Sequence, residues 1–273
     1  MKLLKTCGSF PLHCGRGADG LLPSRCGAGH SPLVDLFLNL IGRNGVMKMR
    51  KFVSLLALLL LAGCQHPRPV EGFEKCLGTL PGASRQAVTV ASDGASGMAL
   101  RLYERGSDGW QPIGAAIPAV VGRNGLAPVG EKREGDGRTP SGVFPLERGF
   151  GYGPLVTRIP YIVLTPEMIW IDDPRSGRYN TLADKKDGAG LSYEIMKRGD
   201  DLYKYGIVVE YNTSATVPGA GSAIFFHIWS SPSASTAGCI ATAEPDMLRI
   251  LLWLDPAQHP LAVIGDCPSP EWK

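Results

Sequence analysis

The sequence lacks several signatures that would indicate common functions. It has no G-x-x-x-x-G-K-[ST] motif, so the glycine-rich stretch 135–142 does not predict a phosphate-binding loop. No group of Cys, His, Asp and Glu residues has the spacing of a zinc site, which argues against a metal centre. No long internal repeat is present either. We therefore expect neither a metal nor a cofactor.

The chain also lacks a surplus of basic residues once its N-terminal part is set aside. The formal net charge of all 273 residues is +3. Residues 1–64 hold eight of the 28 Lys and Arg residues and two of the 25 Asp and Glu residues, which leaves 20 basic and 23 acidic side chains, a formal balance of −3. Because non-specific nucleic-acid binding depends on net positive charge, nucleic acid is not an expected partner.

No apolar run is long enough to span a bilayer comfortably, which takes about 20 residues. The run 52–61 has the length of a signal-peptide core; it follows Met49-Arg50-Lys51 and leads into Leu61-Ala62-Gly63-Cys64. A basic start, a short apolar core and small residues before a cleavage point are typical of a secretory signal. Residues 47–64 are therefore predicted to direct export.

The end of this segment also resembles the bacterial lipobox, which implies that Cys64 is lipidated and tethers the protein to a membrane face. An ordinary cleaved signal or an uncleaved anchor is the alternative. Residues 1–46 precede the signal without sustained periodicity, and we expect them not to belong to the native protein; a disordered extension is the alternative. The remaining segments are predicted as a Pro- and Gly-rich tether, one folded domain and a C-terminal tail at 65–83, 84–265 and 266–273.

The domain has the pattern of a mainly β protein. Short β-branched and aromatic segments separated by turn signals predict strands at 86–91, 98–104, 162–165, 205–211, 223–228 and 261–265. Closely spaced strands of this kind favour a β-sandwich or barrel-like sheets over a βαβ fold. One helix is expected at 244–254, where Pro245 and acidic residues mark the start and apolar residues recur at i, i+3, i+4 and i+7.

Cys239 and His227 form the residue pair that suggests chemistry. His227 ends an apolar run, and Cys239 follows a Ser- and Pro-rich loop with Ala237 and Gly238 directly before it. A histidine can take the thiol proton so that the sulfur attacks a carbonyl carbon, and a nearby imidazolium would give a low-pKa thiol. Small residues leave room for backbone N–H groups to face an oxyanion. From these residues alone, a buried structural thiol and a core histidine remain the alternative.

Two separated motifs carry a resemblance to a known family. His227 is followed by Thr236-Ala237-Gly238-Cys239-Ile240, and an earlier stretch reads Glu134-Gly135-Asp136-Gly137-Arg138-Thr139-Pro140-Ser141-Gly142-Val143-Phe144. Over residues 84–265 the chain resembles the L,D-transpeptidases of the YkuD type, which act on bacterial peptidoglycan. The resemblance implies the family's mainly β fold, with a helix after the catalytic cysteine.

The resemblance also implies roles for individual residues. Cys239 would be the nucleophile and His227 its base, with the Ile228 carbonyl orienting the imidazole. Backbone N–H groups around Ala237, Gly238 and Cys239 would stabilise the oxyanion. Residues expected to contact the substrate are Arg138, Thr236 and Trp229. The implied reaction breaks the bond after the L-centre of diaminopimelate in a stem peptide, releases D-Ala and leaves a thioester that an amine of a neighbouring stem resolves.

The chain departs from the family pattern at three positions. Ala237, Ala241 and Ile228 stand where the family commonly has His, Arg and Gly. These departures leave the thiol and its base intact, so we expect acyl-enzyme chemistry; a hydrolase of the same bond and a non-catalytic peptidoglycan-binding lipoprotein are the alternatives. Two further cysteines of the exported part, Cys76 and Cys267, are expected to form a disulfide that closes a long loop.

Overall fold

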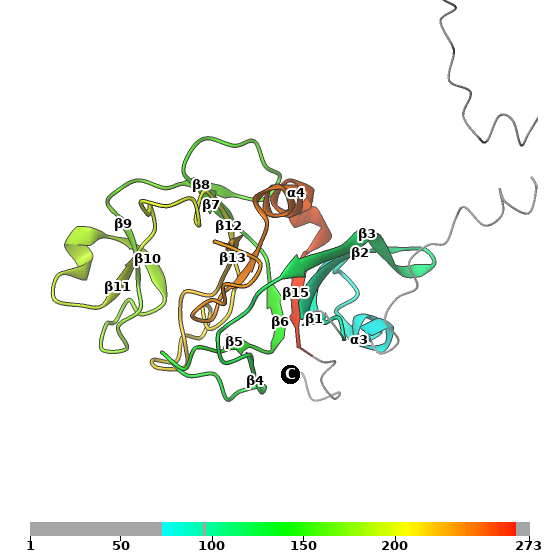
Figure 1. Cartoon of the computed structure of the whole chain (residues 1–273), viewed down its shortest axis with the longest axis horizontal. Coiled ribbons are helices and arrows are strands. Elements are labelled where there is room, and N and C mark those ends of the chain that lie inside the picture. Colours follow the sequence, from blue (N-terminus) through cyan, green and yellow to red (C-terminus); the bar gives the residue numbers. More distant parts are fainter. Residues whose placement is uncertain (1–72, 95–96, 266–273) are drawn as a thin grey trace, which may run out of the picture. The chain divides into compact units, whose positions relative to one another are not determined.

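The computed structural model describes residues 73–94 and 97–265. Within this part the chain forms two five-stranded sheets, a three-stranded sheet and a two-stranded sheet, with few helices (Figure 1). The prediction of a mainly β fold with a helix after the cysteine is confirmed. None of the helices in these residues is long and apolar enough to cross a membrane. Predicted features that lie outside the described residues are Cys64, Cys267 and the segments 1–46, 47–64 and 266–273.

The first sheet joins the beginning and the end of the domain. Its order is β3-β2-β1-β15-β6, with β1 (Gln86–Ser92), β2 (Met98–Gly106), β3 (Gly109–Ala119), β6 (Gly142–Pro145) and β15 (Leu261–Ile264). The first three strands form an antiparallel meander, and β1 pairs in parallel with β15. Apolar side chains of β1 and β2 are buried on both faces of this sheet, which needs a cover on each side.

A short helix covers one face of the first sheet and corrects a sequence prediction. Residues 65–83 were expected to form a tether, but α3 (Phe73–Thr79) occupies part of that range. Cys76 and Leu77 are buried in a cluster with Tyr103 of β2 and Val263 of β15. The folded domain therefore begins before residue 84, because this helix supplies the apolar cover that the sheet face requires.

The second sheet carries the residues of the predicted site. Its order is β14-β13-β12-β7-β8, with β7 (Gly149–Gly151), β8 (Tyr161–Val163), β12 (Tyr205–Val208), β13 (Phe225–Ile228) and β14 (Ile240–Thr242). β13 pairs antiparallel with β12 and in parallel with β14. Glycine is needed where these strands meet bulky rings: a Cβ at Gly206 would lie 2.2 Å from the Phe150 ring.

Helix α4 (Glu244–Trp253) follows β14 and packs against both sheets through one hydrophobic core. Its predicted apolar face is confirmed: Met247, Ile250, Leu251 and the following Leu254 are all fully buried. Burying a leucine or isoleucine side chain of this kind contributes about 1.5–3 kcal/mol. The strand and turn before α4, which contain Cys239, are thus held by a packed helix.

The smaller sheets complete the domain. β9 (Met168–Ile171) pairs with β10 (Thr181–Asp184) and β11 (Tyr193–Ile195), and β4 (Leu126–Ala127) pairs with β5 (Thr139–Pro140). Two short 3-10 helices are η1 (Lys185–Gly188) and η2 (Pro256–Gln258). The three-stranded sheet lies beside the second sheet (Figure 1), where the ring of Trp170 packs edge-on against Phe225 at 5.0 Å. Trp170 is therefore a core residue.

Candidate active site

The fold brings Cys239 and His227 to adjacent strands. His227 is on β13, and Cys239 directly precedes β14, which pairs with β13 so that His227 is opposite Ala241. Cys239 is 8% exposed, and its Sγ donates a hydrogen bond to the Ala223 carbonyl oxygen at 3.2 Å. A thiol that donates in this way holds its proton, so the sulfur is protonated in the resting site.

The imidazole of His227 is fixed by the main chain. Its Nδ1 lies 2.8 Å from the carbonyl oxygen of Ile228, the contact expected from the sequence. A carbonyl can only accept, so the neutral ring carries its hydrogen on Nδ1, and Nε2 is the basic nitrogen. The ring is 7% exposed and packs edge-on against Tyr203 at a centroid distance of 5.2 Å. These contacts set the tautomer that a general base requires.

Two threonines hold the turn before the nucleophile. Thr236 Oγ1 donates to the Cys239 carbonyl oxygen at 2.6 Å and accepts from the Gly238 N–H at 3.1 Å. Thr139 Oγ1 donates to the same carbonyl oxygen at 3.2 Å and accepts from the Gly122 N–H at 2.9 Å. Thr139 belongs to the second sequence motif, so that motif contacts the backbone of the nucleophile.

One of the three expected oxyanion donors, the Gly238 N–H, already has an acceptor. The Gly238 N–H is occupied by Thr236, whereas the amides of Ala237 and Cys239 have no acceptor within the described residues. Gly238 is required for a different reason, since a Cβ there would lie 3.0 Å from the Arg138 carbonyl oxygen. Ala237 and Cys239 therefore remain the candidate donors.

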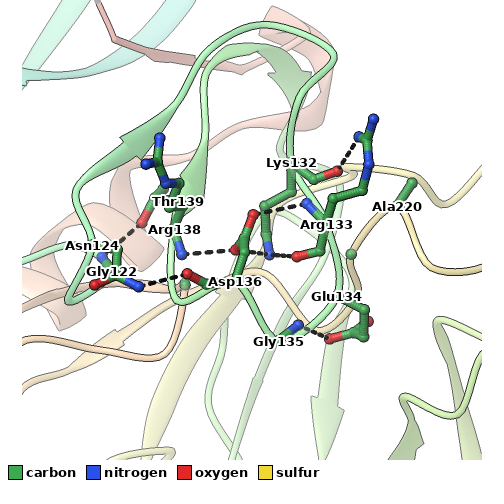
Figure 2. A network of polar contacts seen from close by, with 12 residues as sticks. Gly122, Asn124, Lys132, Arg133, Glu134, Gly135, Asp136, Arg138, Thr139 and Ala220 are labelled. Atoms are coloured by element: carbon green, nitrogen blue, oxygen red, sulfur yellow. Dashed lines mark hydrogen bonds and ion pairs between the residues drawn. The ribbon is translucent and has the colours of Figure 1, made fainter.

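The loop that contains the second motif is cross-linked by hydrogen bonds to Asp136. Asp136 accepts from Lys132 Nζ at 2.7 Å and from the N–H groups of Arg133 and Arg138, each at 2.8 Å (Figure 2). The side chain of Arg138, which was expected to contact the substrate, is exposed and is not part of the cleft lining described below. Its backbone instead shapes the turn beside Gly238.

Cys239 and His227 line one cleft of about 430 Å³. Thr236 and Trp229 also line it, as expected for substrate-contacting residues. Charged and hydroxyl side chains also line the cleft: Arg123, Lys132, Glu134, Asp172, Glu194, Arg198, Tyr203 and Ser222. Sequence reasoning missed the last four of these. These four residues belong to neither sequence motif, so no motif pointed to them. Within the described residues, no group of three or more His, Cys, Asp or Glu side chains is arranged to hold a metal ion.

Burial keeps the reacting pair neutral. It raises the pKa of the Cys239 thiol to about 12, and the negative charge of Glu194 acts in the same direction. Burial also lowers the pKa of His227 to about 4, although the Ile228 carbonyl opposes this shift. The expectation of a low-pKa thiol is therefore wrong for the resting protein, because desolvation outweighs any favourable charge. The resting site therefore holds a neutral thiol and a neutral imidazole.

Comparison with known proteins decides the family. The family model described as the L,D-transpeptidase catalytic domain (YkuD) matches residues 93–263, well over half of the chain. The chain belongs to this family. The matched residues include both Cys239 and His227, and L,D-transpeptidases of this family are cysteine-dependent enzymes that act on peptidoglycan. No curated protein and no solved structure matches the chain.

Proposed function

We propose that this L,D-transpeptidase-family protein forms a thioester between Cys239 and a peptidoglycan stem peptide and transfers the acyl group to an amine. The observation that carries the proposal is the shared cleft, in which Cys239 lies beside a histidine whose Nδ1 is bound to the Ile228 carbonyl. That contact leaves Nε2 as the base. A nucleophile, an oriented base and free amides near an accessible cleft are the parts that acyl transfer needs.

The first half-reaction, formation of the thioester, starts from a neutral thiol and a neutral imidazole. As Sγ of Cys239 bonds to the carbonyl carbon after the L-centre of diaminopimelate, the thiol proton passes to Nε2 of His227. The oxyanion accepts hydrogen bonds from the Ala237 and Cys239 amides, each such donor typically contributing about 3–4 kcal/mol. When the C–N bond breaks, the imidazolium returns its proton to the amine of the departing D-Ala. The products are a thioester, free D-Ala and a neutral imidazole.

The second half-reaction decides between transfer and hydrolysis. An amine of a neighbouring stem that attacks the thioester gives a cross-link, and water gives an L,D-carboxypeptidase product. In either case His227 takes a proton from the attacking atom and passes it to the departing Cys239 sulfur. Three carboxylates of the cleft lining, those of Glu134, Asp172 and Glu194, favour the amine, because negative side chains attract a cationic acceptor.

The test is intact-mass spectrometry of the purified protein after incubation with tetrapeptide-stem muropeptides and, separately, with a carbapenem. We expect a covalent adduct on the wild-type protein and none on a Cys239→Ala variant with an unchanged circular dichroism spectrum. Cross-linked muropeptide dimers would support transfer, and shortened stems alone would support the hydrolase. A wild-type protein that forms no adduct and changes no muropeptide would favour a non-catalytic peptidoglycan-binding role.

We also propose that the protein is exported and held on a membrane through lipidated Cys64. The support is the sequence pattern of residues 47–64, a basic start, a short apolar run and a lipobox-like end. Metabolic labelling with a radiolabelled fatty acid tests this. Label that persists in a Cys64→Ala variant would contradict the proposal.

A further inference from the structure

Three carboxylates line the cleft that contains Cys239. Glu134 comes from the loop between β4 and β5, Asp172 follows β9, and Glu194 is in the middle of β11. All three line the same cleft as the reacting pair. They lie between 22 and 60 residues apart in the sequence, so only the fold brings them together.

The cations of the cleft do not neutralise these carboxylates. Lys132 forms its ion pair with Asp136 at 2.7 Å. Arg198 donates three hydrogen bonds to Asp200, the shortest from an Nη to Oδ2 at 2.8 Å, and approaches Glu194 only to 3.9 Å. The third cation of the lining, Arg123, forms no ion pair within the described residues. Because Lys132 and Arg198 are engaged by Asp136 and Asp200, which do not line the cleft, the three carboxylates leave the lining with a surplus of negative charge.

Hydrogen bonds occupy the other two carboxylates to different degrees. Glu134 Oε2 accepts from the hydroxyls of Tyr179 and Ser222, the latter at 2.6 Å. Asp172 Oδ1 is buried and has no hydrogen-bond partner within the described residues. The side chain of Glu194 is 27% exposed, so a substrate group can reach it.

Glu194 is connected to the reacting pair through Tyr203. The Tyr203 hydroxyl donates to Glu194 Oε1 at 2.5 Å. The ring of Tyr203 packs edge-on against the His227 imidazole and belongs to the same buried cluster as Cys239. Tyr203 thus links the Glu194 carboxylate to the packing around the reacting pair.

Transfer of the acyl group to a protonated amine requires the removal of one more proton than transfer to water. An aliphatic amine is protonated at neutral pH, with a pKa of about 10 for a lysine-like group, and an ammonium ion has no lone pair for attack. His227 removes one proton during the attack and returns it to the Cys239 sulfur. The extra proton of the ammonium ion needs a second acceptor.

We propose that Glu194 is this second acceptor, a catalytic base for the acyl acceptor that Tyr203 positions; the proposal rests on the proposed function. The N–H bond of the ammonium breaks, and an O–H bond forms on Glu194. The freed lone pair attacks the thioester carbon, the C–S bond breaks, and the second proton passes through His227 to the departing sulfur. Glu194 then releases its proton to water, so the sum is thioester plus ammonium giving amide, thiol and a proton.

The electrostatic surroundings suit this role. Burial raises the pKa of Glu194, and the charges of Asp172 and Glu134 raise it further, while the Tyr203 hydrogen bond and Arg198 act against the shift. A carboxylate with a raised pKa accepts a proton more readily at neutral pH. The same three carboxylates attract the cationic acceptor before the transfer.

The test compares two nucleophiles on the preformed acyl-enzyme of the full chain. Glu194→Gln is the informative variant, because its amide oxygen still accepts the Tyr203 hydrogen bond. Glu167→Gln is the matched control, an exposed carboxylate just before β9 that does not line the cleft. Each thioester is isolated and then resolved at pH 7 by an acceptor stem amine or by hydroxylamine, which is neutral at that pH. Intact mass gives both rates.

We expect the ratio of amine to hydroxylamine resolution to fall at least about tenfold in Glu194→Gln, within the range of general-base effects. The ratio should recover as the pH approaches the pKa of the acceptor amine, and it should stay at the wild-type value in Glu167→Gln. Tyr203→Phe should lower the ratio less, since the carboxylate remains.

Other results overturn the proposal in distinguishable ways. An unchanged ratio in Glu194→Gln, or an equal loss with both nucleophiles, excludes the base role and leaves the proposed function intact. A wild-type thioester that water resolves and amines do not would establish a hydrolase and exclude an acceptor base. A wild-type protein that forms no thioester would overturn the proposed function and this inference together.

Discussion

The two five-stranded sheets share one core but treat their buried polar side chains differently. In the first sheet Gln86 is buried with both ends satisfied, donating to the Trp253 carbonyl at 3.0 Å and accepting from the Asp255 N–H at 2.8 Å. In the second sheet and its adjoining turn, His227 and Cys239 are equally buried but face a cleft. Buried polar groups whose hydrogen bonds are all satisfied stabilise a fold. Buried groups with a free nucleophilic or basic atom facing a cavity can react.

This difference indicates a division of labour between the sheets. The first sheet is paired along long strands, from the β1–β2 meander to β15 at the end of the domain. The second sheet has strands of three or four residues that end at the reacting pair. We therefore expect substitutions in the first sheet and its cover to change stability, and substitutions around the second to change reactivity. Three predictions test this division.

The largest expected effect is on stability, from Leu77→Ala in α3. Leu77 is fully buried against the first sheet, on the face that α3 covers. Truncating a buried leucine typically costs about 2–5 kcal/mol of unfolding free energy. Chemical denaturation monitored by circular dichroism measures the loss, and the folded variant should still form a Cys239 adduct at the wild-type rate. A stability change below about 1 kcal/mol would mean that α3 is a dispensable part of the tether.

The next effect concerns pH and is specific to the second sheet. A solvent-exposed histidine base with a pKa of about 6.5 would lose about 30-fold of its basic form between pH 8 and pH 5. Burial favours the neutral imidazole and lowers the pKa of His227 to about 4, so the base-competent form persists to lower pH. We expect the second-order rate of carbapenem acylation to stay nearly constant from pH 7 to pH 5 and to fall near pH 4. A decline centred near pH 6.5 would contradict the buried neutral pair.

The sequence predicted those helices and strands whose whole apolar pattern lies within a short stretch of the chain. The strand at 86–91 and the helix at 244–254 were expected and correspond to β1 and α4, because β-branched runs and an i, i+3, i+4 face report burial directly. Strand β3 was not expected, since it contains Pro112 and Pro118 and exposes much of its length. Proline is tolerated there because β3 is an edge strand, paired only with β2.

The same distinction between local patterns and long-range packing applies to the residues of the site. Cys239, His227 and the contact to the Ile228 carbonyl were expected from a motif within 13 residues. Glu194 and Tyr203 were not expected, because only the packing of the three-stranded sheet brings them to the cleft. The thiol pKa was also misjudged, since sequence shows which charges are present but not how far a group is removed from water.

The smallest expected effect comes from Thr139, which contributes both to the stability of the fold and to the position of the nucleophile. Thr139 is fully buried and bridges the Gly122 N–H to the Cys239 carbonyl, so Thr139→Val keeps the shape but removes both hydrogen bonds. An unsatisfied buried amide costs about 1–3 kcal/mol, and displacement of the turn should slow acylation by about tenfold. Thr242→Val on β14 is the matched control, since its hydroxyl is also buried and donates to the Pro118 carbonyl at 2.7 Å without touching the nucleophile. The two variants should lose similar unfolding free energy while only Thr139→Val loses acylation rate. Equal losses of rate would mean that the second motif supports the fold as a whole and does not hold the nucleophile in place.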